Sequence, residues 1–404
     1  MRKRETWKKS KSSMNWWGKG MDKQRVCGFD FLRVVSILFV VVIHITSVGL
    51  RLCDSMTGTW IVNALINSIS RWAVPVFFMV SGALFLDPRR ELSIKKLYTK
   101  NISRIAICII AWGFVYSLLD QYLYGTLSAK SILIAVYGII TGNTGYHLWF
   151  LYTLIMLYIA TPLFRLITCH ASKRQLEYAL VVWIIFSLIA GQINSFAAEF
   201  GFDEVLSLYV PFVITGYGGY FLLGHYLTTY PLKGAAKRRC YILAILSACV
   251  ICGGKWILPM TFKIETAAVE APLGLFSCLV AGAVFTVSQN ISISDTGTRV
   301  LSFLGQRTFG IYLTHVFHIF AVSYLACETG LLSAGSGYFR VICRRFCGIA
   351  FCFVDHVKNP AAEEVGIDNE HVKSKKKHIQ YPDKRYGPGD YNCDGDCNTA
   401  SCPG

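Results

Sequence analysis

Long apolar stretches separated by short charged segments recur along most of the chain. Each stretch has about 20 residues, the length that an α-helix needs to cross the roughly 30 Å hydrocarbon core of a bilayer. The pattern predicts an all-α, polytopic integral membrane protein with nine or ten transmembrane helices between residues 26 and 355. The predicted spans are 31–50, 61–86, 103–122, 148–164, 178–197, 207–228, 240–257, 272–289 and 309–327.

Several segments do not fit this spanning pattern. Residues 1–25 form a basic leader with three tryptophans, which we expect on the anionic headgroups of the inner leaflet. The apolar stretch 131–140 is too short to span and is predicted to be interfacial or re-entrant. Residues 340–354 are interrupted by two arginines, and residues 356–404 are predicted to form a polar, disordered tail.

Lysine and arginine are concentrated on one side of the predicted membrane. With the N-terminus inside, the inner segments contain 24 Lys and Arg against 6 Asp and Glu, whereas the outer segments contain 4 against 7. This asymmetry is the positive-inside pattern of a cytoplasmic (inner) membrane protein. The net charge of +16 therefore indicates topology rather than a nucleic-acid partner, and membrane lipids are the expected surroundings.

The first predicted span contains two ionisable side chains, Arg33 and His44, eleven residues apart. Eleven residues make close to three helical turns and rise about 16 Å, so both side chains lie on one face of the helix. An arginine inside a span costs roughly 2.5–3.5 kcal/mol on insertion scales and is tolerated where it faces a polar cavity. Each residue also has an ordinary structural role, as a snorkelling arginine and a helix-packing histidine. Together they favour a functional interior, in which His44 acts as base or nucleophile and Arg33 binds an anion such as phosphate.

The second predicted span contains Arg71 near its middle, four residues before Pro75. Proline has no N–H to donate to the carbonyl of Arg71, so a backbone acceptor is freed beside a buried charge. We favour a position on the wall of a cavity, where Arg71 stabilises developing oxyanion charge. A structural ion pair is the alternative.

A basic segment at 87–100 follows this span and includes Arg89, Arg90, Lys95, Lys96 and Lys100. Such residues fix topology in many membrane proteins. They also suit the polyanionic part of a cytoplasmic cosubstrate. The sequence favours neither role over the other.

Histidines and an aromatic residue lie near the ends of later spans. His147 and Trp149 are predicted at the outer entrance of the fourth span, as contacts of a substrate, although aromatic residues are also common at membrane interfaces. His315 and His318 lie three residues apart near the inner end of the ninth span, and nothing in their spacing specifies a metal. The predicted membrane domain contains no P-loop, dinucleotide fingerprint or cysteine pair at metal spacing, so we expect no metal and no permanently bound cofactor.

These elements, in this order, resemble the membrane-bound acyltransferase-3 family. The resemblance rests on the Arg-x10-His pair of Arg33 and His44 and on three later stretches, and it extends from about residue 26 to 327. NSISRWAVPVFFMVSGALF, YHLWFLYTLIMLYIATPLF and FLGQRTFGIYLTH look most similar to the branch that contains the O-acetyltransferase of the enterobacterial common antigen. Relatives of the membrane half of vancomycin-resistance serine racemases belong to the same branch.

The resemblance implies an enzyme that moves an acyl group, usually acetyl, to a hydroxyl. The implied donor is cytoplasmic acetyl-CoA or another acyl-CoA, and the implied acceptor is a cell-surface polysaccharide or a lipid-linked sugar. By the same resemblance His44 is the catalytic histidine, Arg33 is its motif partner, and Arg71 and the basic residues of 89–96 lie on the donor path. The chain departs from the family, whose members have ten spans, in lacking a clear tenth helix.

Two other classes of function stay compatible with these residues. Intramembrane Arg and His also suit a secondary transporter or a flippase for lipid-linked glycans, although no pair of inverted repeats is evident. A small-molecule uptake or sensing module is the third possibility. Dependence on CoA separates the enzyme from both.

Overall fold

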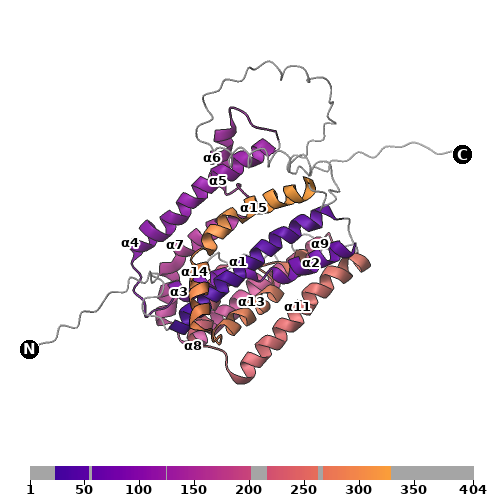
Figure 1. Cartoon of the computed structure of the whole chain (residues 1–404). Coiled ribbons are helices and arrows are strands. Elements are labelled where there is room, and N and C mark those ends of the chain that lie inside the picture. The colour runs from indigo at the N-terminus through magenta and orange to yellow at the C-terminus, as the bar shows by residue number, and fades with distance from the viewer. Residues whose placement is uncertain (1–22, 54–56, 124, 202–215, 263–266, 329–404) are drawn as a thin grey trace, which may run out of the picture. The chain divides into compact units, whose positions relative to one another are not determined.

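The computed structural model describes residues 23–53, 57–123, 125–201, 216–262 and 267–328, and these ranges contain helices and loops without any strand (Figure 1). This confirms the predicted all-helical class. Nearly all of the predicted leader, the interrupted segment 340–354 and the predicted tail 356–404 lie outside the described residues. The helices are α1 (Lys23–Leu52), α2 (Gly58–Ser70), α3 (Ala73–Phe85), α4 (Ile94–Lys96), the π-helix η2 (Leu97–Ile102), α5 (Ser103–Leu123), α6 (Ser131–Thr141), α7 (Trp149–His170), α8 (Lys173–Trp183), the π-helix η3 (Ile184–Ile189), α9 (Ala190–Glu199), α10 (Gly218–Thr229), α11 (Gly234–Phe262), α12 (Ala267–Glu270), α13 (Leu275–Ser288), α14 (Asp295–Gly305) and α15 (Thr308–Glu328).

Six helical stretches of the described chain are long and apolar enough to cross a membrane. The helices α4, η2 and α5 run on without a break, as do α8, η3 and α9, so each set forms one of these stretches. A multi-pass membrane protein is therefore confirmed. The six are Cys27–Arg51, Gly58–Phe85, Ile94–Leu123, Trp149–His170, Lys173–Glu199 and Gly234–Leu258, and shorter apolar helices occupy Ser131–Thr141, Leu275–Ser288 and Thr308–Val322.

Two predicted spans differ from the helices observed. The predicted span 272–289 corresponds to α13, which begins at Leu275 and has only 14 residues. The chain forms a turn just before this helix, in which the N–H of Gly274 donates to the carbonyl of Ala271. A helix of this length rises about 21 Å, less than the thickness of the hydrocarbon core. For the predicted span 207–228, α10 begins only at Gly218, and residues 202–215 lie outside the described part of the chain.

The predicted span 61–86 is interrupted at Arg71 and Trp72, where α2 ends and α3 begins. Pro75 explains the interruption, because it has no N–H to bond the carbonyl of Arg71. Pro75 instead occupies the first turn of α3, where a helix needs no internal donor.

The basic segment predicted at 87–100 is helical from Ile94 onward rather than a loop throughout. Ser93 has extended backbone angles, and its hydroxyl accepts a hydrogen bond from the N–H of Lys96 at 3.3 Å, which makes it the N-cap. Lys95, Lys96 and Lys100 therefore project from a helix that continues into α5.

The helices α3 and α10 cross with their backbones in direct contact. A side chain on Gly82 would meet the carbonyl oxygen of Phe221 at 1.7 Å, and one on Gly224 would meet that of Met79 at 1.9 Å. Only glycine fits such a contact, which is the small-residue packing typical of membrane helices. This crossing makes α3 the most completely buried of the long helices, with ten of its 13 residues buried.

The first helix, α1, packs against α2, α3, α13, α14 and α15. Figure 1 shows α15 running beside α1. By contrast, α11 exposes a row of large apolar side chains, as expected of a helix that faces lipid. Residues of α3, α5, α7 and α15 line, together with α1, the site described below.

Candidate functional site

A cavity of about 460 Å³ lies along α1 and extends from Arg33 to His44. Its size is in the range of pockets that hold small molecules. The described residues that line it include neither Asp nor Glu. The lining residues are Arg33, Val40, His44, Val74, Phe77, Val80, Ser81, Leu84, Lys100, Asn101, Arg104, Ile105, His147, Trp149, Phe150, Leu154, Tyr158, Gly305, Gln306, Thr308, Phe309 and Tyr312.

One end of the cavity, here called the cationic end, is formed by Arg33, Lys100 and Arg104. Arg33 is held by Asp30, one helical turn earlier, through an ion pair of 2.9 Å. The guanidinium carbon of Arg104 lies 5.5 Å from the centre of the Phe309 ring, close enough for a cation–π contact. Three cations therefore line one end of the cavity, and the cationic end favours an anion.

A π-helix places two of these cations. Lys100 and Asn101 belong to η2, and the hydroxyl of Ser103 bonds the carbonyl of Tyr98, five residues earlier, at 2.7 Å. One extra residue per turn rotates the side chains that follow it relative to an α-helix, which is why π-turns often occur at functional sites. Here the rotated segment brings Lys100 and Arg104 to the same cavity as Arg33.

The middle of the cavity is apolar. Val40 of α1 lies between Arg33 and His44 on the lining face, and α3 contributes residues at helical spacing, including Val80 and Leu84. Ile105 and Leu154 line the same section from α5 and α7. This section suits an uncharged, flexible chain better than a hydrated ion.

The other end, here called the histidine end, contains His44 and His147. The centres of their rings are 6.5 Å apart, and His315 of α15 lies behind them, 4.9 Å from His44 and 5.3 Å from His147. His147 and His315 are both buried, whereas the adjoining Tyr146 is 58% exposed, with its ring 5.3 Å from that of His44. The histidine end therefore lies close to a surface of the described chain.

Hydrogen bonds from two tyrosines fix this end. The hydroxyl of Tyr312 donates to the backbone carbonyl of His147, and that of Tyr116 donates to the carbonyl of Leu313 at 2.7 Å. These bonds tie the segment before α7 and the helix α5 to α15. Within the described residues no group of three or more His, Cys, Asp and Glu side chains has the arrangement of a metal site.

Sequence reasoning placed His315 near the inner end of its span and gave it no role. The structure places it eight residues into α15 and directly against His44, because α15 packs beside α1. His318, three residues later, is exposed, and its Nδ1 lies 2.8 Å from the carbonyl of Thr314. No local signal separates the two histidines, since only the pairing of distant helices decides which one meets His44.

Arg71 is not among the residues that line the cavity. Its guanidinium lies 3.4 Å from the carboxylate of Glu270, which also contacts Lys255 at 3.1 Å and accepts a hydrogen bond from Ser68. The ion pair, which was the alternative reading of Arg71, is thus present. The sequence gave no sign of Lys255 and Glu270, because they lie on α11 and α12, far along the chain.

Arg89, Arg90, Lys95 and Lys96 do not line the cavity either. Arg89 pairs with Asp87 at 2.8 Å, while Lys95 and Lys96 are exposed. Burial alone would raise the pKa of the Asp87 carboxyl, but the hydrogen bonds and charge of Arg89 outweigh it and hold that pKa below its usual value. The predicted contact of these four residues with a donor stays a prediction.

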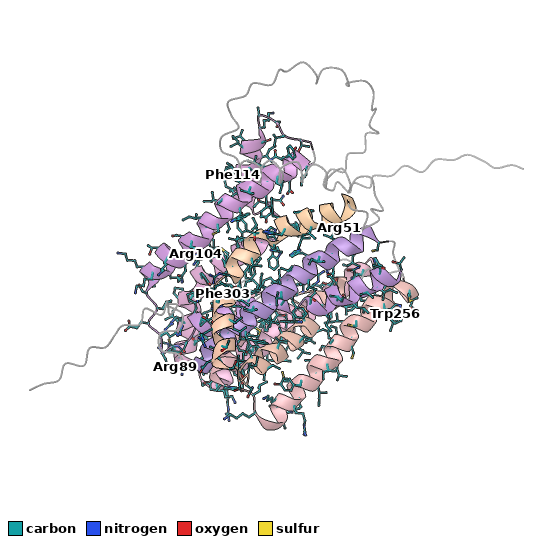
Figure 2. All side chains as sticks on the ribbon, viewed as in Figure 1. Arg51, Arg89, Arg104, Phe114, Trp256 and Phe303 are labelled. Atoms are coloured by element: carbon teal, nitrogen blue, oxygen red, sulfur yellow. The ribbon has the colours of Figure 1, made fainter. Side chains whose placement is uncertain are left out.

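Side chains of α7 donate hydrogen bonds to the backbone at the end of α3 and in the loop that follows it. Arg165 of α7 donates to the carbonyl of Phe85 at 3.1 Å and to that of Arg90 at 2.5 Å. The hydroxyl of Thr168 donates to the carbonyl of Leu86 at 3.0 Å. Figure 2 labels Arg89 in this loop and Arg104 at the start of α5, where the cationic end lies.

Trp149, the last of the predicted site residues, begins α7 and lines the cavity. It is 38% exposed, and its ring lies 5.3 Å from that of Tyr217. Trp149 therefore presents a flat apolar surface to the cavity near His147.

Comparison with known families gives one match. The family model described as an acyltransferase domain, Acyl_transf_3, matches residues 28–353, which is most of the chain. No curated protein and no solved structure matches the chain.

Proposed function

The chain belongs to the acyltransferase 3 family and is a membrane acyltransferase, and from this premise we propose that it moves an acyl group, most simply acetyl, from cytoplasmic acyl-CoA to a hydroxyl of a cell-surface glycan or its lipid-linked precursor. The observation that supports the proposal is the cavity itself. It has cations at one end, an apolar middle and His44 at the other end. Acyl-CoA has the same order of chemistry, since its phosphates are followed by a long flexible arm that ends in a thioester.

In this proposal the donor enters from the cytoplasmic side. Arg33, Lys100 and Arg104 bind its phosphates, because guanidinium and ammonium groups form strong charge-assisted hydrogen bonds to phosphate oxygens. The arm then passes the apolar section toward His44, about 16 Å from Arg33 along α1. The protein lies in the inner membrane in this proposal, and its N-terminus is in the cytoplasm. The excess of positive charge before α1 supports this orientation.

The reaction takes place at His44. As a base, His44 takes the proton of the acceptor hydroxyl while the acceptor oxygen forms a bond to the thioester carbonyl carbon. The carbon–sulfur bond breaks, and the CoA thiolate recovers the proton from His44. As a nucleophile, His44 attacks the thioester carbonyl carbon, the carbon–sulfur bond breaks, and CoA leaves as the thiolate. The acceptor hydroxyl then attacks the acyl-imidazole, the carbon–nitrogen bond breaks, and the hydroxyl proton neutralises the CoA thiolate. Incubation with labelled acyl-CoA alone separates the two roles, because only the second leaves label on the protein.

The acceptor approaches the histidine end. Trp149 provides an exposed aromatic face on the cavity wall, on which a sugar ring can lie. Both ring nitrogens of His147 are buried and have no hydrogen-bond partner among the residues that the structure describes. Arg71 lies within electrostatic reach of His44, and we propose that its charge favours the developing oxyanion from a distance rather than by contact.

The test is transfer of labelled acetyl from acetyl-CoA in a host that lacks its own surface O-acetylation. We expect label in the glycan or lipid-linked fraction with the wild-type protein and none with His44→Ala. His170→Ala is the matched control, since His170 is exposed at the end of α7, and it should transfer normally. Transfer by His44→Ala would overturn the role of His44. Passage of substrate across the membrane without CoA, and without label, would support the transporter or uptake alternatives instead.

A further inference from the structure

The imidazole of His315 has no role in the function proposed above, yet it lies against the ring of His44. It is 4% exposed, and the two ring centres are 4.9 Å apart. His315 is also separate from the cavity wall, so it touches His44 without reaching a substrate. A buried polar ring in this position either fills space or acts on its neighbour.

The hydrogen bonds of His315 determine where its proton lies. Its Nδ1 is 2.6 Å from the backbone carbonyl of Tyr312. A carbonyl oxygen only accepts hydrogen bonds, so Nδ1 must bear the hydrogen. In the neutral ring Nε2 is then an acceptor with a lone pair. This Nε2 is buried and has no hydrogen-bond partner in the described part of the chain.

His44 lacks a complementary partner in the same way. It makes no hydrogen bond to another described residue, and no carboxylate contacts it there. An N–H···N hydrogen bond between two imidazoles needs ring centres about 5 Å apart, since the nitrogens are about 2.9 Å apart and each lies about 1.1 Å from its ring centre. The observed 4.9 Å between the ring centres matches this spacing.

The other groups around His44 fit this role less well. The ring of His147 is farther away, at 6.5 Å, and the hydroxyl of Tyr312 is already bonded to the backbone of His147. The ring of Tyr146 meets His44 edge-on and is exposed. Arg51 and Arg71, which act on His44 through their charges, have no acceptor for an imidazole N–H.

We infer that His315 is a positioning residue for His44. Its Nε2 accepts the N–H of one His44 nitrogen and so keeps the other nitrogen unprotonated toward the cavity. Both roles proposed for His44, base and nucleophile, need such a nitrogen. The carboxylate of a Ser-His-Asp triad holds its histidine in the same manner. The inference rests on the proposed function, because it concerns the catalytic state of His44.

Three substitutions test this inference. His315→Gln keeps an acceptor near the position of Nε2, whereas His315→Asn keeps a donor for the Tyr312 carbonyl and removes the Nε2 acceptor. We expect His315→Asn to lower kcat for acyl transfer about 10- to 100-fold, the usual effect of losing a partner that orients a functional histidine. The KM for acyl-CoA should not change, and His315→Gln should recover a substantial part of the rate. The matched control is His318→Asn, on the same helix but exposed, which should keep the wild-type kcat.

Each outcome has a defined meaning. Equal kcat for wild type, His315→Asn and His315→Gln would overturn the inference while leaving the proposed function intact. Equal losses in both variants, with acyl-CoA binding also lost, would assign His315 to folding and overturn it as well. A wild-type protein that transfers no acyl group would instead refute the proposed function, so the two failures are distinguishable.

Discussion

Replacing Lys100 or Arg104 by alanine should weaken the binding of acyl-CoA without slowing the transfer step. Both residues line the cationic end of the cavity, and both side chains are exposed. Arg33 is a poorer target, because its removal would leave Asp30, whose side chain is only 5% exposed, without the guanidinium that pairs with it. The structure therefore points to the two exposed cations as the informative pair.

The magnitude follows from their exposure. A hydrogen bond to a charged group is worth about 1.5–3 kcal/mol when it is protected from water, and an exposed ion pair is worth about 0.2–1 kcal/mol. We take about 1 kcal/mol for each cation, which corresponds to roughly a 5-fold rise in KM for acyl-CoA. The double variant should approach about 25-fold if the two effects are independent, and less if the residues share one phosphate.

Steady-state kinetics with acyl-CoA as the varied substrate measure this effect, with kcat expected to stay near that of wild type. Lys95→Ala and Lys96→Ala are matched controls, since these lysines belong to the same continuous helix but do not line the cavity. They also test the sequence-based prediction that they bind the donor. If the control variants raise KM as much as Lys100→Ala and Arg104→Ala, or if none of the four raises it, the reasoning from the cavity is refuted.

Three predictions concern stability in detergent. Gly224→Ala should lower the free energy of unfolding by about 3 kcal/mol or more, because the added methyl overlaps a backbone carbonyl of α3. Gly191→Ala is the control and should be neutral or stabilising, since its methyl meets no atom within 4 Å. Melting temperatures of the two variants measure the difference. Glu270→Gln should cost about 2 kcal/mol in thermal unfolding, since it leaves two half-buried cations without their shared carboxylate. Arg165→Ala should expose the loop after α3 to proteolysis, because the carbonyls of Phe85 and Arg90 lose a charged donor. Faster cleavage in this loop by an added protease measures the effect.

The first helix shows how far sequence reasoning reaches. Arg33 and His44 were predicted to share a face from their spacing alone, and both line the same cavity. This worked because helical periodicity is local: three turns of one unbroken helix place two side chains without reference to any other element. The break at Arg71 and Trp72 also has a local cause, Pro75, although the sequence analysis predicted one continuous span there.

The partners of these residues could not be predicted. His315 lies 271 positions after His44 in the chain, and nothing near it in sequence distinguishes it from His318. Lys100 belongs to the basic segment 87–100, but the sequence did not show that this lysine and Arg104 line the same cavity, because their directions depend on the π-helix η2. A π-turn has no reliable sequence pattern, and helix pairing depends on the packing of the whole bundle.

The continuity of α1 has a further consequence, for the kinds of sequence change that the site can tolerate. The number of residues between Arg33 and His44 sets both the distance and the relative direction of their side chains along the helix. Inserting or deleting one residue would turn His44 by about 100° and shift it by about 1.5 Å, which removes its ring from the cavity and from His315. Inserting a full turn would restore the direction but displace the ring by about 5 Å. Exposed positions along this stretch, such as Leu38, are therefore open to replacement, whereas the count of eleven steps between Arg33 and His44 is not.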